Sequence, residues 1–205
     1  MLIYAVFLVL AIVTSAEVAD VSEVADVSEV ADVSDAVAND DSGRQKCWET
    51  GWVKISPHTV CFEAKGNRYG SFNNYVGGRM VTAIKLEYVS GKVRCIGGVK
   101  YDSRWGCFNY AYFKKFPLDV IVTDDNNNVL FPKQQYIKHR AGLWYWMPFV
   151  HPLDSDELIF TDYRTPFYFP LHKEMRIWYG EDLKNWGEGN NAGRVCVNVY
   201  ARFKL

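Results

Sequence analysis

The sequence lacks any hydrophobic run long enough to cross a bilayer, which argues against an integral membrane protein. A transmembrane helix needs about 20 mostly apolar residues, whereas the N-terminal apolar run covers only residues 2–13. That run ends in Thr-Ser-Ala at 14–16, small residues of the kind that signal peptidase accepts. We therefore predict a signal peptide at residues 1–16 and a mature protein that is secreted and extracellular.

Recognisable catalytic motifs are also missing. The sequence contains no GxSxG, HExxH or CxxC pattern, which are the local signatures of serine hydrolases, zinc proteases and many zinc sites. Its four histidines show no recognised spacing to one another or to a nucleophile. Its bases are scattered rather than clustered, which argues against nucleic acid as a partner. We predict a non-enzymatic protein that does not bind nucleic acid.

No amphipathic helical stripe of ten residues or more is present, which argues against a helical protein. Instead, apolar residues recur with the period of two that is typical of strands, at 80–88, 118–122, 175–179 and 195–203. In the first of these segments, one face would carry Met80, Thr82, Ile84, Leu86 and Tyr88. Turn-forming Gly, Asn and Asp residues separate the segments. We predict one all-β domain over residues 47–205, an antiparallel β-sandwich of jelly-roll type.

Aromatic residues are absent from residues 17–34, which repeat EVADVS three times. A six-residue period forms no apolar stripe on a helix and no clean apolar face on a strand. Residues 17–46 hold nine acids and two bases (net −7), whereas residues 47–205 hold fifteen acids and twenty-one bases (net +6). We predict a disordered acidic segment at 17–46, either a solvating spacer or a pro-segment that masks the basic domain.

Cysteine is scarce and odd in number, at positions 47, 61, 95, 107 and 196. In an oxidising compartment, the simplest outcome is two disulfides and one free thiol. Cys95 and Cys107 bracket an eleven-residue Gly-rich loop, so we predict that they bond to each other. Cys196, in the last predicted strand, is expected to bond to Cys47 or to Cys61 and thereby join the two ends of the domain.

The densest group of polar side chains lies between two predicted strands in the Gly-rich segment 179–196. Calcium binds six to eight oxygen ligands from carboxylates, amides and carbonyls on flexible loops. We therefore predict calcium as a cofactor, with these ligands: Glu181, Asp182, Glu188, Asn190 and Asn191. The segment lacks the EF-hand register, so the alternative is a solvated hairpin loop. The Asp-Asn run at 124–128 looks similar, and we interpret it as a simple turn.

Two segments, 101–115 and 143–149, are rich in aromatic residues. Exposed aromatic rings beside hydrogen-bonding groups suit stacking on sugars, and rings beside Lys and Arg also suit membrane interfaces. We therefore predict four side chains as ligand contacts: Trp105, Trp144, Tyr145 and Trp146. The alternative is that these rings belong to the core.

The C-terminal pattern RIWYGEDL at 176–183, followed by NNxGRVCVNVYA at 190–201, resembles the ending of uncharacterised secreted invertebrate domains. The motifs VTAIKLxYVSG at 81–91 and SRWGC at 103–107 are similar to these domains as well. The resemblance covers most of residues 47–205. It implies a secreted, disulfide-bonded β-domain, and it implies no activity and no residue roles.

Together these features predict a secreted binding module that recognises a glycan or another extracellular polymer with the help of calcium. One alternative is a membrane-active defence or toxin-like protein, whose basic aromatic domain contacts a membrane surface once the acidic segment is removed. Another is a structural component of a secreted matrix. In that case the carboxylates of the repeat, at every third position from 17 to 32, would bind mineral or calcium.

Overall fold

The computed structural model of the protein describes residues 51–204. The predicted signal peptide, the acidic segment 17–46 and Cys47 lie outside the described residues. Within residues 51–204, no helix combines the length and the apolar character that crossing a bilayer requires.

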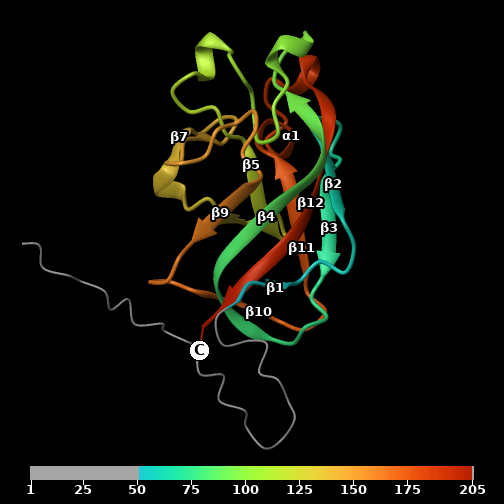
Figure 1. Cartoon of the computed structure of the whole chain (residues 1–205), viewed down its shortest axis with the longest axis vertical. Coiled ribbons are helices and arrows are strands. Elements are labelled where there is room, and N and C mark those ends of the chain that lie inside the picture. Colours follow the sequence, from blue (N-terminus) through green and yellow to red (C-terminus); the bar gives the residue numbers. More distant parts are fainter. Residues whose placement is uncertain (1–50, 205) are drawn as a thin grey trace, which may run out of the picture. The chain divides into compact units, whose positions relative to one another are not determined.

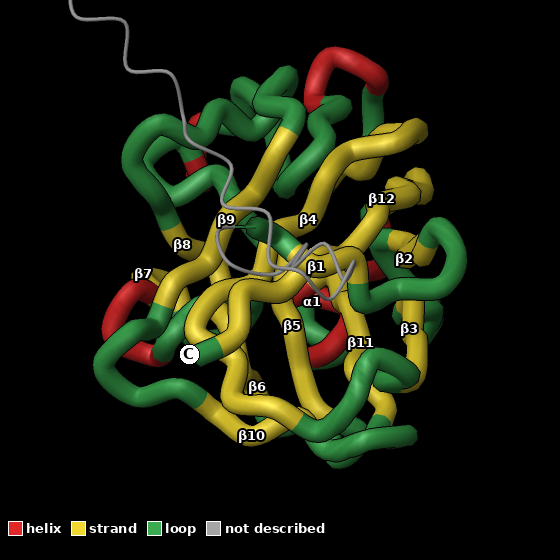
Figure 2. Tube along the Cα trace, turned by 60° about the horizontal axis from the view of Figure 1, so that its bottom comes forward, coloured by secondary structure: helices red, strands yellow, loops and turns green. Residues whose placement is uncertain are grey.

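Antiparallel strands account for most of the regular structure (Figures 1 and 2). The larger sheet has six strands: β1 (Val53–Lys54), β2 (Val60–Glu63), β4 (Arg79–Arg94), β9 (Glu157–Thr161), β10 (Phe167–Phe169) and β12 (Ala192–Phe203). The second sheet has four: β3 (Gly70–Asn73), β5 (Val120–Asp124), β6 (Val129–Phe131) and β11 (Glu174–Tyr179). A two-stranded ribbon pairs β7 (Ile137–His139) with β8 (Trp144–Tyr145). The predicted all-β, sandwich-like antiparallel fold is confirmed.

Helical structure is confined to short turns between strands. One α-helical turn, α1 (Gly180–Leu183), follows β11 directly. The 3₁₀ turns are η1 (Val99–Tyr101), η2 (Ala111–Phe113), η3 (Gln134–Tyr136) and η4 (Glu188–Asn190). Figure 2 shows these turns among the loops that connect the strands. Because the loops are free of the repeating constraints of a sheet, they are where binding residues tend to be placed.

Strands β4 and β12 form the longest pairing in the fold, and they run side by side in Figure 1. As expected, Ile84 and Leu86 point into the core and are fully buried. The predicted face of residues 80–88 does not extend along the whole strand, because Val81 is buried whereas Met80 is exposed. A register shift opposite Val81 and Ala83 interrupts the ladder there, and such a shift exchanges the inward and outward sides of a strand.

Both sheets contribute to a single hydrophobic core that includes the fully buried aromatic residues Trp105, Trp144, Tyr145 and Tyr179. Two disulfides connect parts of this fold. The predicted bond between Cys95 and Cys107 is confirmed.

Cys196 on β12 bonds to Cys61, which lies directly opposite it on β2. Of the two partners expected for Cys196, Cys61 is therefore correct and Cys47 is wrong. The physical reason is the register of β2 against β12, which sequence spacing alone does not show.

Candidate functional site

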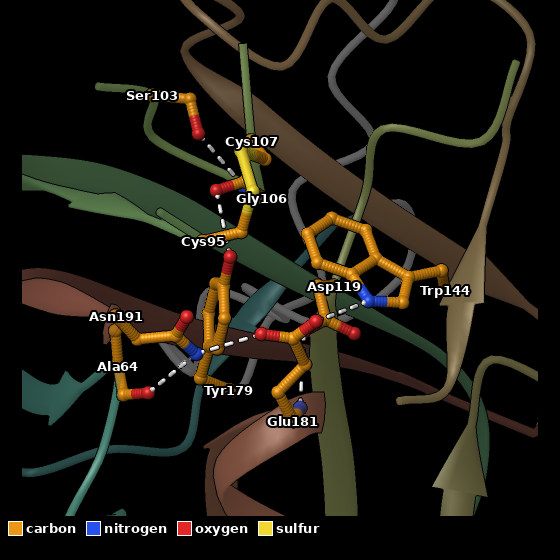
Figure 3. The surroundings of a disulfide bond; sticks show 10 residues. All are labelled: Ala64, Cys95, Ser103, Gly106, Cys107, Asp119, Trp144, Tyr179, Glu181 and Asn191. Carbon is orange, nitrogen blue, oxygen red and sulfur yellow. Dashed lines mark hydrogen bonds between the residues drawn. A yellow bond between two sulfur atoms is a disulfide. The ribbon is translucent and has the colours of Figure 1, made fainter. Parts of the chain in front are cut away.

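A buried polar cluster lies where β11 runs into α1, and its central residue is Glu181 (Figure 3). The Glu181 carboxyl accepts a hydrogen bond from Trp144 Nε1 at 3.0 Å and another from Asn191 Nδ2 at 2.8 Å. The same Asn191 amide also donates to the Ala64 carbonyl at 3.1 Å. Glu181 and Asn191 are almost completely buried. The cluster therefore joins segments from three distant parts of the sequence.

Asp182 and Glu188 fasten this cluster to the loop between β2 and β3. The two carboxylate oxygens of Asp182 accept hydrogen bonds from the backbone N–H groups of Asn67, at 2.7 Å, and Arg68, at 3.0 Å. Glu188 Oε2 accepts one from the N–H of Gly66 at 3.0 Å. Gly66 and Asn67 both have positive φ, so three successive N–H groups turn toward the two carboxylates. Successive backbone N–H groups of this kind form a concave anion-binding site.

A fourth carboxylate, Asp119, lies next to Glu181 and has no exposed surface. Its Oδ2 accepts a hydrogen bond from the Glu181 N–H at 3.1 Å, whereas its Oδ1 has no hydrogen-bond partner among the described residues. The backbone of Gly180 packs directly against Oδ1, and a Cβ atom at this position would clash with it. Gly180 is therefore required for the close approach of α1 to β5.

Three carboxyl groups of the cluster, those of Glu181, Asp182 and Asp119, have raised pKa values. Burial, with a contribution from the nearby Glu188, raises the pKa of Glu181 to about 7. Burial together with the contact of its side chain with Glu188 raises the pKa of Asp182 to about 6. Burial and the charge of Glu181 raise the pKa of Asp119 well above its ordinary value. Within residues 51–204, no Lys or Arg forms an ion pair with any of these carboxylates. Among the described residues, the cluster therefore surrounds its carboxyl groups with backbone and side-chain N–H donors rather than with cationic side chains.

The disulfide loop supports the cluster from one side (Figure 3). Tyr179, the residue before α1, donates its hydroxyl hydrogen to the Gly106 carbonyl at 3.0 Å. The Gly106 N–H in turn donates to Ser103 Oγ at 3.0 Å, next to the disulfide of Cys107. The cluster is thus held in place by covalent and hydrogen-bonded contacts.

A second feature of the surface is an open hollow of about 670 Å³ at the outer side of β9. It is lined by Met147, Pro148, Phe149, Val150, Ser155, Asp156, Glu157 and Ile159. The Phe149 side chain is 103% exposed, as much as in an extended peptide. The hollow is separate in sequence from the carboxylate cluster.

Among solved structures, the chain is similar to AJLec, a lectin from the sea anemone Anthopleura japonica. The two share 36% sequence identity and superpose with a TM-score of 0.68, over 75% of this chain and 98% of AJLec. The chain belongs to the AJLec family. No protein-family model matches the sequence, and no curated protein matches it.

Membership of the AJLec family makes this chain a lectin-like binding protein. Lectins bind without catalysing a reaction, which agrees with the prediction that the protein is not an enzyme. Of the expected calcium ligands, Asn191 donates to Glu181 and the Asp182 side chain contacts that of Glu188, whereas the Asn190 amide faces the Cys95 and Gly187 carbonyls. Within residues 51–204, however, no three His, Cys, Asp or Glu side chains converge closely enough to hold a metal ion by themselves. Their role in binding calcium therefore stays a prediction.

For three of the four aromatic residues predicted as ligand contacts, the prediction is wrong. Trp105, Trp144 and Tyr145 have no exposed side-chain surface, so direct contact with a ligand is excluded and the core alternative is correct. Trp144 stacks on Phe113, with 3.8 Å between the ring centroids, and Tyr145 donates to the Val120 carbonyl at 2.7 Å. Trp146, at 52% exposure, keeps an accessible ring.

Sequence reasoning missed two residues: Asp119 in the carboxylate cluster and Phe149 at the hollow. Asp119 sits in an apolar strand segment and looks like an ordinary strand-edge acid, and nothing nearby in sequence indicates its contact with Glu181. Phe149 belongs to the aromatic segment 143–149, but sequence alternation does not distinguish its exposed ring from the buried rings at 144 and 145.

Proposed function

We propose that this protein is a secreted lectin that binds glycans at the surface of the carboxylate cluster, with calcium bound by Asp182 and Glu188. The observation that carries the proposal is the similarity to a lectin over 98% of the AJLec chain. The carboxyl groups of the cluster, which pair with no Lys or Arg among the described residues, support the location. Glu181, Asp182 and Asn191 form the buried base, and Glu188 lies half-buried beside the N–H of Gly66.

The chemistry of the pair formed by Asp182 and Glu188 favours a cation. Their side chains contact each other, and this contact raises the pKa of Asp182. Two adjacent carboxylates repel each other unless one is protonated or a cation neutralises both. Calcium accepts six to eight oxygens at about 2.3–2.6 Å, including backbone carbonyls, amide oxygens and water. Coordination positions that protein atoms do not fill can accept the hydroxyl groups of a sugar.

A glycan array read with calcium and with EDTA tests this proposal. We expect the full-length protein to bind a subset of glycans with calcium and to lose that binding in EDTA. Glu188→Gln should weaken calcium-dependent binding at least about tenfold, because it removes a charged ligand from the ion. The matched control is Asp125→Asn, which removes one carboxylate from an acidic loop elsewhere in the domain and should leave binding unchanged.

Glycan binding, the calcium site and secretion can each be contradicted by a separate result. An array without any glycan signal would contradict glycan binding. Glycan binding that is unaffected by EDTA and by Glu188→Gln would contradict the calcium site and its place in the cluster. Release of the protein into the culture medium from cells that express the full chain would support secretion, and retention inside the cells would contradict it.

A further inference from the structure

The five residues Trp146 to Val150, which we call the apolar loop, expose hydrophobic surface without forming part of the core. The loop contains no charged residue. Phe149 is 103% exposed and Trp146 is 52% exposed, and Met147 and Val150 are half-buried. Large apolar side chains gathered on one exposed segment usually mark a surface that binds something.

Both ends of the apolar loop are anchored rigidly. On the N-terminal side, Trp144 and Tyr145 are buried in the core. On the C-terminal side, the Pro152 carbonyl accepts hydrogen bonds from the N–H groups of Arg104 and Trp105, at 2.8 and 3.1 Å. Contacts with the folded domain therefore hold the apolar loop at both of its ends.

Phe149 also adopts an unfavourable backbone conformation. Its φ of 61° lies in the left-handed region, which a bulky residue enters at a cost in conformational energy. Such residues concentrate at binding sites, where the surrounding structure holds them in place. Here the strained backbone directs an aromatic ring into solvent at the edge of the hollow.

The lining of the hollow is also partly polar. Ser155, Asp156 and Glu157 line it, and Asp156 has a side chain that is 87% exposed. Arg104 Nη1 forms an ion pair with Asp156, and Lys85 Nζ forms one with Glu157 at 2.6 Å. These pairings orient the two carboxylates and leave acceptor capacity on their oxygens. Phe149 and the two carboxylates line the same open hollow of about 670 Å³, which therefore offers both an aromatic surface and hydrogen-bond acceptors to a small ligand.

We propose that this hollow is a second saccharide subsite, which binds an uncharged pyranose ring without calcium. The C–H face of the sugar packs on Phe149, and its hydroxyl groups donate hydrogen bonds to Asp156 and Glu157. This inference rests on the proposed glycan binding but uses none of the residues of the carboxylate cluster. An uncharged ligand fits because Arg104 and Lys85 already pair with Asp156 and Glu157, so neither sign of charge dominates this part of the hollow.

The test uses NMR titration of the full-length protein in EDTA with four probes: the methyl pyranosides of glucose, galactose, mannose and N-acetylglucosamine. We expect at least one probe to bind without calcium. Phe149→Ala should raise its dissociation constant about 3- to 10-fold, because the aromatic contact is lost. The matched control is Tyr75→Ala, which removes a 63% exposed ring outside the hollow and should leave the dissociation constant unchanged. Glu188→Gln should also leave it unchanged.

Three outcomes would overturn the proposal. One is the absence of binding to all four probes in EDTA, and another is equal binding by the Phe149→Ala variant. The third is a Phe149-dependent interaction of another kind: sedimentation with phosphatidylcholine vesicles would assign the loop to a membrane surface, and self-association in ultracentrifugation would assign it to a second copy of this chain. Calcium-dependent binding on the glycan array is a separate measurement, so either proposal can fail without the other.

Discussion

Two loops of this protein both combine acidic residues with asparagine, yet the pKa values of their carboxyl groups shift in opposite directions. The turn between β5 and β6, residues 124–128, contains two Asp and three Asn, and the segment 181–191 also combines acids with Asn. In the first, Asp125 is paired with Lys173, and the hydrogen bond from this lysine lowers the pKa of Asp125. In the second, burial raises the pKa of Glu181 to about 7. Similar residues thus serve a simple turn in one place and a carboxylate cluster in the other.

The difference comes from what surrounds each loop. Asp124 accepts hydrogen bonds from the N–H groups of Asn126 and Asn128 within its own turn, at 2.9 and 2.8 Å, which supports its interpretation as a simple turn. Glu181 and Asp182 are bonded instead to Trp144, Asn191 and the 67–68 backbone, far away in sequence. A carboxylate with local partners in water keeps its charge easily, whereas one carried into a protein interior does not.

Removal of the Glu181 side chain should have the largest effect on stability. Glu181→Ala leaves Trp144 Nε1 buried without its acceptor and opens a void, so we expect a loss of about 2–4 kcal/mol in unfolding free energy. Urea denaturation at pH 4 measures this loss, because the carboxyl is then mostly protonated in both the folded and the unfolded state. A loss below about 0.5 kcal/mol, typical of surface substitutions, would show that the cluster is not structural.

The pH dependence of stability should also distinguish the two loops. The folded-state pKa of Glu181, about 7, lies above its ordinary value of 4.5. Its contribution to stability is therefore fully present below about pH 4.5 and is lost as the pH rises through 7. The loss amounts to at most about 3.5 kcal/mol, at about 1.4 kcal/mol per pKa unit. Urea midpoints without divalent ions should accordingly fall between pH 5 and pH 8.

The control for this titration is Glu181→Gln, which retains the shape of the side chain and removes its ionisation. Its stability should vary less between pH 5 and pH 8 than that of the wild type. The remaining slope should come from Asp182, whose pKa is raised to about 6. If wild type and variant show the same slope, burial of Glu181 does not govern the titration.

The smallest effect is expected in the 124–128 turn. Asp125→Asn removes the ion pair with Lys173, which joins an exposed lysine to a partly exposed carboxylate at the surface. Such surface pairs contribute little to stability, because water and salt screen them. We expect a thermal midpoint within experimental error of the wild type at 0.15 M salt. A clear decrease would mean that this turn, too, depends on electrostatics for its fold.

The aromatic run Leu143 to Phe149 shows how far sequence reasoning extends. Its hydrophobic character indicated that part of it would be exposed, but it did not indicate which part. Trp144 and Tyr145 pair in β8 and are covered by the core, whereas Trp146 and Phe149 lie beyond the end of that strand. Because the run is apolar on both alternating faces, its periodicity carries no information about which residues face solvent.

The sequence by itself determined the strand-forming periodicity, the loop positions and the local disulfide of Cys95 with Cys107. Each of these depends on residues that are close together along the chain. Only the tertiary structure decided that Cys196 bonds to Cys61, that Asp119 lies next to Glu181, and that Phe149 projects from the surface. These outcomes depend on strand register and on burial against distant segments, and neither quantity is contained in local spacing.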